Sequence, residues 1–115
     1  MAQYSDGRYI DRKASAVIAA YTVVKQSSTR QVATATAATD VFGVAANATL
    51  AAGETVSVCG INSHGTFKVK LGGTVSFGDK LTSNSSGLAV ATTTSGNIVF
   101  GIAQEAGVSG QVIEY

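Results

Sequence analysis

The sequence predicts an all-β fold, a small single-domain barrel or sandwich of short strands with an extended N-terminal arm. Residues 66–71 alternate, with Phe67, Val69 and Leu71 on one face and polar side chains on the other. This period of two is typical of a half-buried strand. The 13 glycines stand mostly between the apolar runs, where turns need positive φ. Turn residues recur every several positions along residues 53–87, which favours a compact barrel or sandwich.

The N-terminal segment reads differently from the rest. Residues 1–13 are polar and show neither a helical nor a strand pattern, so they predict an arm that is extended or disordered. Residues 14–24 are apolar enough for a buried strand or a short helix, and the β-forming residues at 21–24 favour a strand in the second half. We therefore expect residues 1–30 to be an arm with a first strand, and residues 31–115 to be the body.

The body should contain most of eight or nine strands. A polar turn is predicted at residues 25–29. Further strands are predicted at residues 31–39, 41–45, 55–59, 66–71, 87–92, 98–103 and 111–115. Segments 41–45 and 99–103 share a Phe-Gly-aliphatic-Ala motif, which makes them candidates for equivalent edges of one barrel.

Composition limits the possible partners. A chain of 115 residues fits one domain, but only 7% of it is aromatic, so the core should be thin and a second copy is a natural source of further apolar burial. Charged residues make up 13% and the net charge is +1, which argues against general nucleic-acid binding. Residues 1–30 hold five basic and two acidic residues, whereas residues 31–115 hold three and five. The basic segment is either a solvated terminus or an arm that meets an acidic partner.

No segment predicts export or membrane insertion. There is no apolar run of about 20 residues and no signal peptide, so we expect the protein to stay in the cytoplasm where it is made. The single Cys59 excludes an internal disulfide. The sequons at Asn47 and Asn84 are then only polar turns.

The inventory of catalytic groups is nearly empty. Cys59 and His64 flank one predicted hairpin turn, but a small buried thiol and an ordinary turn histidine explain them far better than a catalytic pair does. One His and one Cys make no zinc site, and no phosphate-binding or dinucleotide motif occurs, so no metal and no cofactor is expected. Lys68 and Lys70 share one strand face, which is most simply a solvated face. The sequence thus predicts a protein that acts through its surface and not as an enzyme.

A series of short motifs runs in a fixed order through the body. They are Phe-Gly-Val-Ala at 42–45, Ala-Gly-Glu-Thr-Val-Ser-Val at 52–58, Gly-Thr-Phe-Lys-Val at 65–69, Val-Ser-Phe-Gly-Asp-Lys-Leu at 75–81, Ser-Gly-Leu-Ala at 86–89, Gly-Ile-Ala-Gln-Glu-Ala at 101–106 and Gly-Gln-Val-Ile at 110–113. In this order, over about two-thirds of the chain, the sequence resembles the head decoration, or capsid cement, proteins of tailed bacteriophages.

The resemblance implies a β-rich body, often trimeric, on the outer surface of the virion. It would bind the expanded head at three-fold or quasi-three-fold positions and clamp neighbouring subunits of the major capsid protein. In lambda-type decoration proteins the N-terminal segment contacts the capsid, and an extended arm can add a strand to a sheet edge. The residues of this chain that would make such contacts are Tyr4, Arg8, Tyr9, Ile10 and Arg12.

Three alternatives stay open at this stage. The chain is also compatible with a tail or fibre module, or with a minor capsid protein. A carbohydrate- or peptide-binding module would need an aromatic-lined groove, and the four phenylalanines all fall in strand patterns. An enzyme would have to depend on Cys59 or His64.

Overall fold

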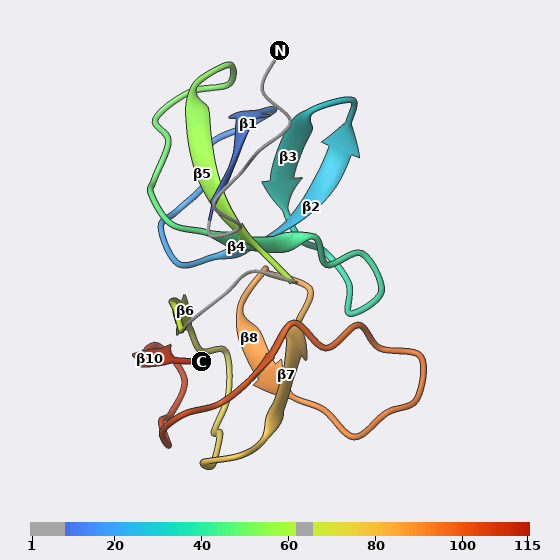
Figure 1. The fold of residues 1–115 in the computed structure, drawn as a ribbon, viewed down its shortest axis with the longest axis vertical. Helices are drawn as coiled ribbons and strands as arrows, with labels where there is room; N and C mark the ends of the chain where they lie inside the picture. Colours follow the sequence, from blue (N-terminus) through green and yellow to red (C-terminus); the bar gives the residue numbers. More distant parts are fainter. Residues whose placement is uncertain (1–8, 62–65) are drawn as a thin grey trace.

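The computed structural model describes residues 9–61 and 66–115, and these contain ten strands and no helix. The predicted all-β fold is therefore confirmed. The molecule measures 41 × 28 × 25 Å. Figure 1 shows a barrel at one end of the long axis and short sheets at the other. We call residues 9–61 the barrel half and residues 66–115 the sheet half.

A closed barrel makes up the first half, with strand order β1-β3-β2-β4-β5. Its strands are β1 (Ile10–Ala14), β2 (Val23–Ser28), β3 (Gln31–Thr34), β4 (Gly43–Ala45) and β5 (Thr55–Gly60). All pairings are antiparallel except that of β1 with β3, which joins only two residue pairs, Lys13 with Gln31 and Ala14 with Val32. The N-terminal part of β1 therefore pairs with β5 alone.

Two expectations for the N-terminal segment were wrong. No strand was predicted within residues 1–13, yet Ile10–Ala14 forms β1, paired with β5 over four residues. A polar turn was predicted at 25–29, yet β2 continues to Ser28 and the chain turns at residues 29–30. Both segments carry polar residues on the outer face of a small barrel, which hides their strand character from a hydropathy pattern.

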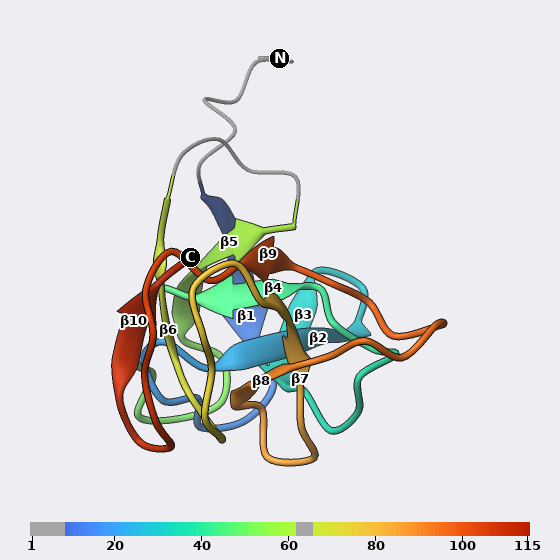
Figure 2. The ribbon, with the colours of Figure 1, turned by 90° about the horizontal axis from the view of Figure 1, so that it is seen from below.

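The sheet half consists of two small sheets with order β10-β6 and β8-β7-β9. The strands are β6 (Lys68–Lys70), β7 (Lys80–Ser83), β8 (Ala89–Ala91), β9 (Gly101–Ile102) and β10 (Val112–Glu114). Seen from below in Figure 2, the β6–β10 pair lies beside the sheet that contains β7 and β8. Because β4 belongs to the barrel and β9 to the three-stranded sheet, the shared motif does not mark equivalent strands.

Strands β2 and β4 form a wall shared by two cores. Val24 faces the barrel interior, while its neighbour Val23 faces the sheet half; Ala45 and Val44 divide in the same way. The barrel core comprises Ala14, Ile18, Val24, Val32, Ala45, Val56 and Val58. The second core comprises Val23, Ala35, Val41, Val44, Val69, Leu71, Val75, Leu81, Ala89, Phe100, Ala103 and Ile113. Because successive side chains of a strand point to opposite faces, the same two strands contribute to both cores and connect the halves.

A tight turn of the sheet half, which includes Gly87, packs against strand β2 of the barrel. The carbonyl of Gly87 accepts a hydrogen bond from the Val23 N–H at 2.8 Å. Gly87 has φ +75°, and a side chain there would overlap the methyl group of Thr34 and lie 2.9 Å from that of Thr22. Only glycine meets both demands without strain.

The loop between β8 and β9 projects from the sheet half, shown in orange in Figure 1. Its base is closed by Asn97, whose Nδ2 donates to Thr92 Oγ1 at 2.9 Å. At its tip Gly96 faces open space, because no atom lies within 4 Å of the place that a Cβ would occupy.

Candidate functional site

The five residues predicted to contact a capsid divide into two groups. Tyr4 and Arg8 lie outside the described residues. Tyr9, Ile10 and Arg12 lie at the start of the barrel, the last two on strand β1. Tyr9 lines a hollow at the waist between the halves, Arg12 lines another at the free end of the barrel, and Ile10 lines neither of these two hollows.

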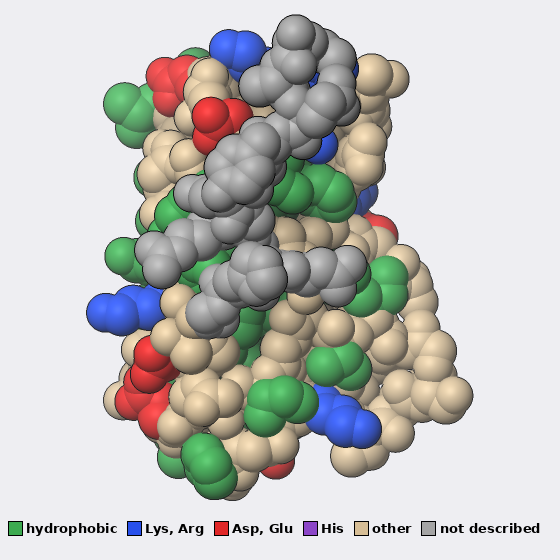
Figure 3. Space-filling model, viewed as in Figure 1, with side chains coloured by type: hydrophobic (Ala, Val, Ile, Leu, Met, Phe, Trp, Pro, Cys, Tyr) green, Lys and Arg blue, Asp and Glu red, His purple; other side chains and the backbone are tan. Residues whose placement is uncertain are grey.

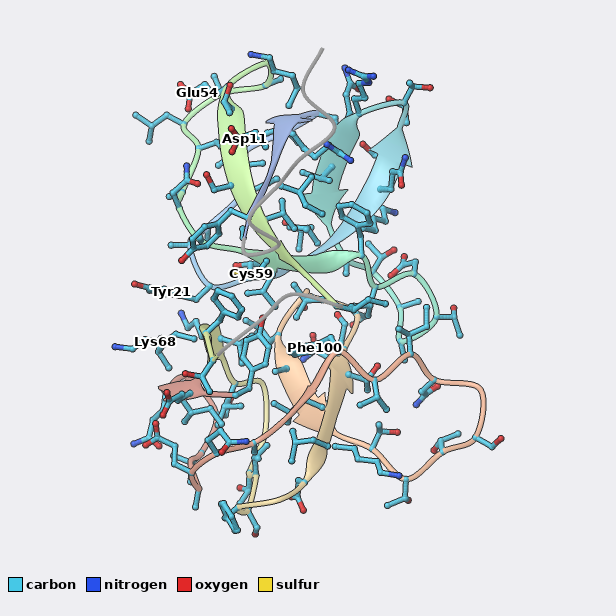
Figure 4. The ribbon with its side chains drawn as sticks, viewed as in Figure 1. Asp11, Tyr21, Glu54, Cys59, Lys68 and Phe100 are labelled. Atoms are coloured by element: carbon cyan, nitrogen blue, oxygen red, sulfur yellow. The ribbon has the colours of Figure 1, made fainter. Side chains whose placement is uncertain are left out.

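Tyr9 belongs to the waist. Its ring is 45% exposed and meets the Phe67 ring edge-on, with centroids 5.6 Å apart. Both line a hollow of about 320 Å³ together with Tyr21 and Cys59. Figure 4 shows Tyr21, Cys59 and Lys68 gathered at this level, between the barrel and the sheets.

The ring contacts continue across the waist to the end of the chain. Phe67 lies 6.3 Å from Tyr115, and Tyr115 lies edge-on to Phe100 at 5.0 Å. Phe67 and Tyr115 also exchange two backbone hydrogen bonds, of 2.8 and 3.1 Å. A second hollow of about 250 Å³, lined by Ile61 and Ile102 among others, lies beside these rings. The aromatic series therefore joins the two halves.

Sequence reasoning missed this aromatic waist because it counted only phenylalanines. Three of the lining rings are tyrosines, at 9, 21 and 115, and they come from segments that are far apart in the sequence. The tyrosine in the apparently polar N-terminal segment was a signal for this packing, because a tyrosine can bury a large apolar ring and keep its polar hydroxyl in water.

The chemistry at the waist is that of packing. Burial raises the pKa of the Cys59 thiol to about 12, so the sulfur carries its proton at neutral pH. Burial, aided by the nearby Cys59 and Tyr9, also raises the pKa of Tyr115. His64, which was predicted to flank the same hairpin turn as Cys59, lies outside the described residues. Within the described ranges no three His, Cys, Asp or Glu residues are grouped as metal ligands, and no helix is long and apolar enough to cross a membrane.

Ile10 and Arg12 occupy the inward face of β1. They pair in register with Val58 and Val56 of β5, both of which are fully buried. The Arg12 guanidinium lies over the Phe42 ring, 5.8 Å from its centroid, a distance typical of a cation–π contact. Arg12 Nε is buried and has no hydrogen-bond partner among the described residues.

A hollow of about 320 Å³ opens at the barrel end. It is lined by Asp11, Arg12, Lys13, Arg30 and Thr55, and we call these residues the barrel-end hollow. Lys13 Nζ donates to Thr55 Oγ1 at 3.0 Å, which fixes the ammonium over β5. Figure 3 shows Lys and Arg side chains at this end of the molecule, with acidic side chains nearby. The sequence grouped Arg12, Lys13 and Arg30 only as members of one basic segment, and their place around one hollow depends on the fold, which brings the β2–β3 turn beside β1.

A family model described as phage cement protein matches residues 4–113. Among solved structures, the chain is similar to the N base of the head fibre gp8.5 of bacteriophage phi29, with 25% sequence identity and a TM-score of 0.72. That similarity covers 92% of this chain and 89% of the other. A search of curated protein sequences found no match.

Proposed function

The chain belongs to the phage cement protein family, a family of phage head structural proteins, and we propose that it binds the outside of the expanded head. The proposal has three parts. The protein sits at three-fold or quasi-three-fold positions, it bridges subunits of the major capsid protein, and it does so as a homotrimer. The family match over residues 4–113 is the observation that carries the proposal.

The geometry supports a contact through the N-terminal segment. Tyr9 directly precedes β1, and Ile10 and Arg12 lie in its N-terminal part. That part of the strand pairs on only one side. Two further cations, Lys13 and Arg30, lie at the same end of the molecule. A basic end of the barrel next to a partly unpaired strand suits strand addition to a partner sheet. We assign this contact to the five residues Tyr4, Arg8, Tyr9, Ile10 and Arg12.

A trimer makes such contacts effective. One small contact of this kind is weak. Three contacts around a common symmetry axis are stronger together, because once one subunit is bound the other two are held at a high effective concentration near their sites. The avidity therefore increases without any new chemistry. Because the protein binds the expanded lattice preferentially, it stabilises that lattice by mass action.

The test is a co-sedimentation assay with expanded heads that lack the protein. The full chain is compared with a chain that lacks residues 1–8. The truncation stops there because Ile10–Ala14 is a barrel strand, and removing it would unfold the barrel. We expect saturable binding of the full chain and a large loss for the truncated one. Equal binding by both would move the contact away from residues 1–8, and no binding by either would reject head binding.

Cementing and trimer formation need their own measurements. Decorated heads should withstand heating and chelators better than bare heads, and equal survival would reject the cementing role. Sedimentation equilibrium of the free protein should give three times the mass of one chain, 11.6 kDa. A monomer at all concentrations would restrict trimer formation to the head surface.

A second candidate is the base of a longer head appendage. The similarity to the head-fibre base of phi29, over 92% of this chain, favours it specifically. Cryo-microscopy of whole particles separates the two candidates. A low knob over each binding position supports cement, and a projecting fibre above the knob supports the base.

A further inference from the structure

The barrel-end hollow gathers three cations from two chain segments. Arg12 and Lys13 come from β1, and Arg30 comes from the turn between β2 and β3. The parallel register of Lys13 with Gln31 is what brings this turn beside β1. Three like charges around one hollow repel each other unless something neutralises them.

The neighbouring acids do not neutralise these cations. The Asp11 carboxylate accepts a hydrogen bond from Ser57 Oγ at 3.2 Å, on the β5 side. The Glu54 carboxylate accepts the Leu50 N–H at 2.7 Å, and Glu54 does not line the hollow. Figure 4 shows both acids on the barrel half. In the described part of the chain the one ion pair within 4.0 Å is elsewhere, between Lys25 and Asp40.

Two further features distinguish the arginines of this hollow. Arg12 Nε is buried without a hydrogen-bond partner among the described residues, although a buried charged donor that lacks an acceptor is costly. Arg30 has φ 59°, in the left-handed region that is unfavourable for a non-glycine residue. A strained Arg at a position suited to Gly or Asn suggests that the side chain is needed there.

The size and charge of the hollow favour a carboxylate over a nucleic acid. Guanidinium groups match the two oxygens of a carboxylate. Duplex DNA requires a broad basic footprint, whereas this end carries three cations with Asp11 and Glu54 around them, on a chain of net charge +1.

We propose that the barrel-end hollow binds an acidic peptide segment of the major capsid protein, with its carboxylates against Arg12, Lys13 and Arg30. This rests on the proposed function, because it names the chemistry of the capsid partner. The cation–π contact with Phe42, and a hydrogen bond from Arg12 Nη1 to the Asp11 carbonyl at 3.0 Å, hold the Arg12 guanidinium in place.

The test uses an octaglutamate peptide as the probe, followed by fluorescence anisotropy at low ionic strength, with a short DNA duplex as the alternative ligand. The main variant is Arg30→Asn, because Asn removes the charge and tolerates left-handed backbone. Lys80→Gln, an exposed lysine on β7 of the sheet half, is the matched control for loss of one positive charge. Arg30→Lys restores the charge. Thermal unfolding verifies that all variants are folded.

We expect octaglutamate to bind, Arg30→Asn to weaken binding about tenfold, and Arg30→Lys to recover much of it, while Lys80→Gln changes binding less than twofold. Absence of octaglutamate binding, or equal binding by Arg30→Asn and Lys80→Gln, overturns the inference. Tighter binding of the DNA duplex overturns it in favour of a nucleic acid.

Head co-sedimentation, run in parallel, distinguishes this inference from the proposed function. If heads bind the chain and its Arg30→Asn variant equally, the inference fails and head binding stands. If octaglutamate binds but heads do not, the proposed function fails and the capsid is rejected as the acidic partner.

Discussion

The barrel half and the sheet half reach stability by different routes. In the barrel, five strands close on themselves and enclose a core built from small aliphatic side chains. The sheet half has two short sheets, and its core is completed by the barrel half. Four of the twelve residues of this core, Val23, Ala35, Val41 and Val44, come from the barrel half. The sheet half therefore depends on the barrel for part of its apolar burial.

This difference explains how a chain with few aromatic residues builds two cores. Strand β4 and the first two residues of β2 are buried on both faces, so each strand contributes one side chain of a neighbouring pair to each core. Every apolar side chain on the wall removes surface from water on one side, and the backbone of the wall is shared. The halves should therefore unfold together, and the following variants test that expectation.

The largest expected effect comes from Leu81→Ala. Leu81 is fully buried in the core of the sheet half, so its truncation should cost about 3 kcal/mol of unfolding free energy. Val56→Ala, in the barrel core, removes less volume and should cost about 2 kcal/mol. Urea unfolding followed by circular dichroism and by tyrosine fluorescence measures both. Each variant should keep one transition with an unchanged m value, and two separate transitions for Leu81→Ala would show that the halves are independent.

Gly87→Ala tests the contact between the halves directly. The new methyl group would overlap Thr34 and force a left-handed alanine, so we expect a loss of about 2 kcal/mol. Gly96→Ala is the control, because Gly96 also has positive φ but has open space around it, and it should cost about 1 kcal/mol. The difference between the denaturation midpoints of the two variants measures how tightly the Gly87 turn packs against the barrel. Equal losses would mean that this turn does not join the halves.

The smallest effect concerns the Cys59 thiol at the waist. Its pKa rises from 9.0 to about 12 in the folded chain because burial disfavours the thiolate. Between these values the unfolded chain has released the proton and the folded chain retains it, so stability falls as the pH rises through this window. Cys59→Ala should show a shallower decline of melting temperature from about pH 9 upward. Identical pH profiles of the two proteins would mean that the thiol is not desolvated.

The sequence predicted the sheet-forming runs well where one face is buried and the other solvated. The alternation at 66–71 is β6, with Val69 buried between Lys68 and Lys70, and the run at 55–59 is β5. Strand β1 escaped prediction because its inward face carries Arg12, which lies on the Phe42 ring instead of in water. The side chain that hides the strand is acceptable there only because of a partner 30 positions away in the sequence.

The candidate site was predictable only as a list of residues. The polar N-terminal segment pointed to Tyr9, Ile10 and Arg12, but the placement of Tyr9 at the waist and of Arg12 at the barrel end depends on the barrel register. Arg30 illustrates the limit. A polar residue in a turn looks ordinary, and its left-handed backbone and position beside β1 exist only in the fold. The family resemblance stated from ordered motifs was confirmed by the match over residues 4–113.

The projecting loop between β8 and β9 has a practical consequence. Its base is closed by Asn97 and Thr92, and there is open space where a side chain at Gly96 would stand, so we expect that a peptide inserted there would not disturb either core. The loop belongs to the sheet half and projects sideways from it in Figure 1. If the barrel end faces the head, a foreign epitope or enzyme tag placed in this loop would be presented outward on every bound copy. The scaffold would then serve as a carrier for dense display of cargo on a particle.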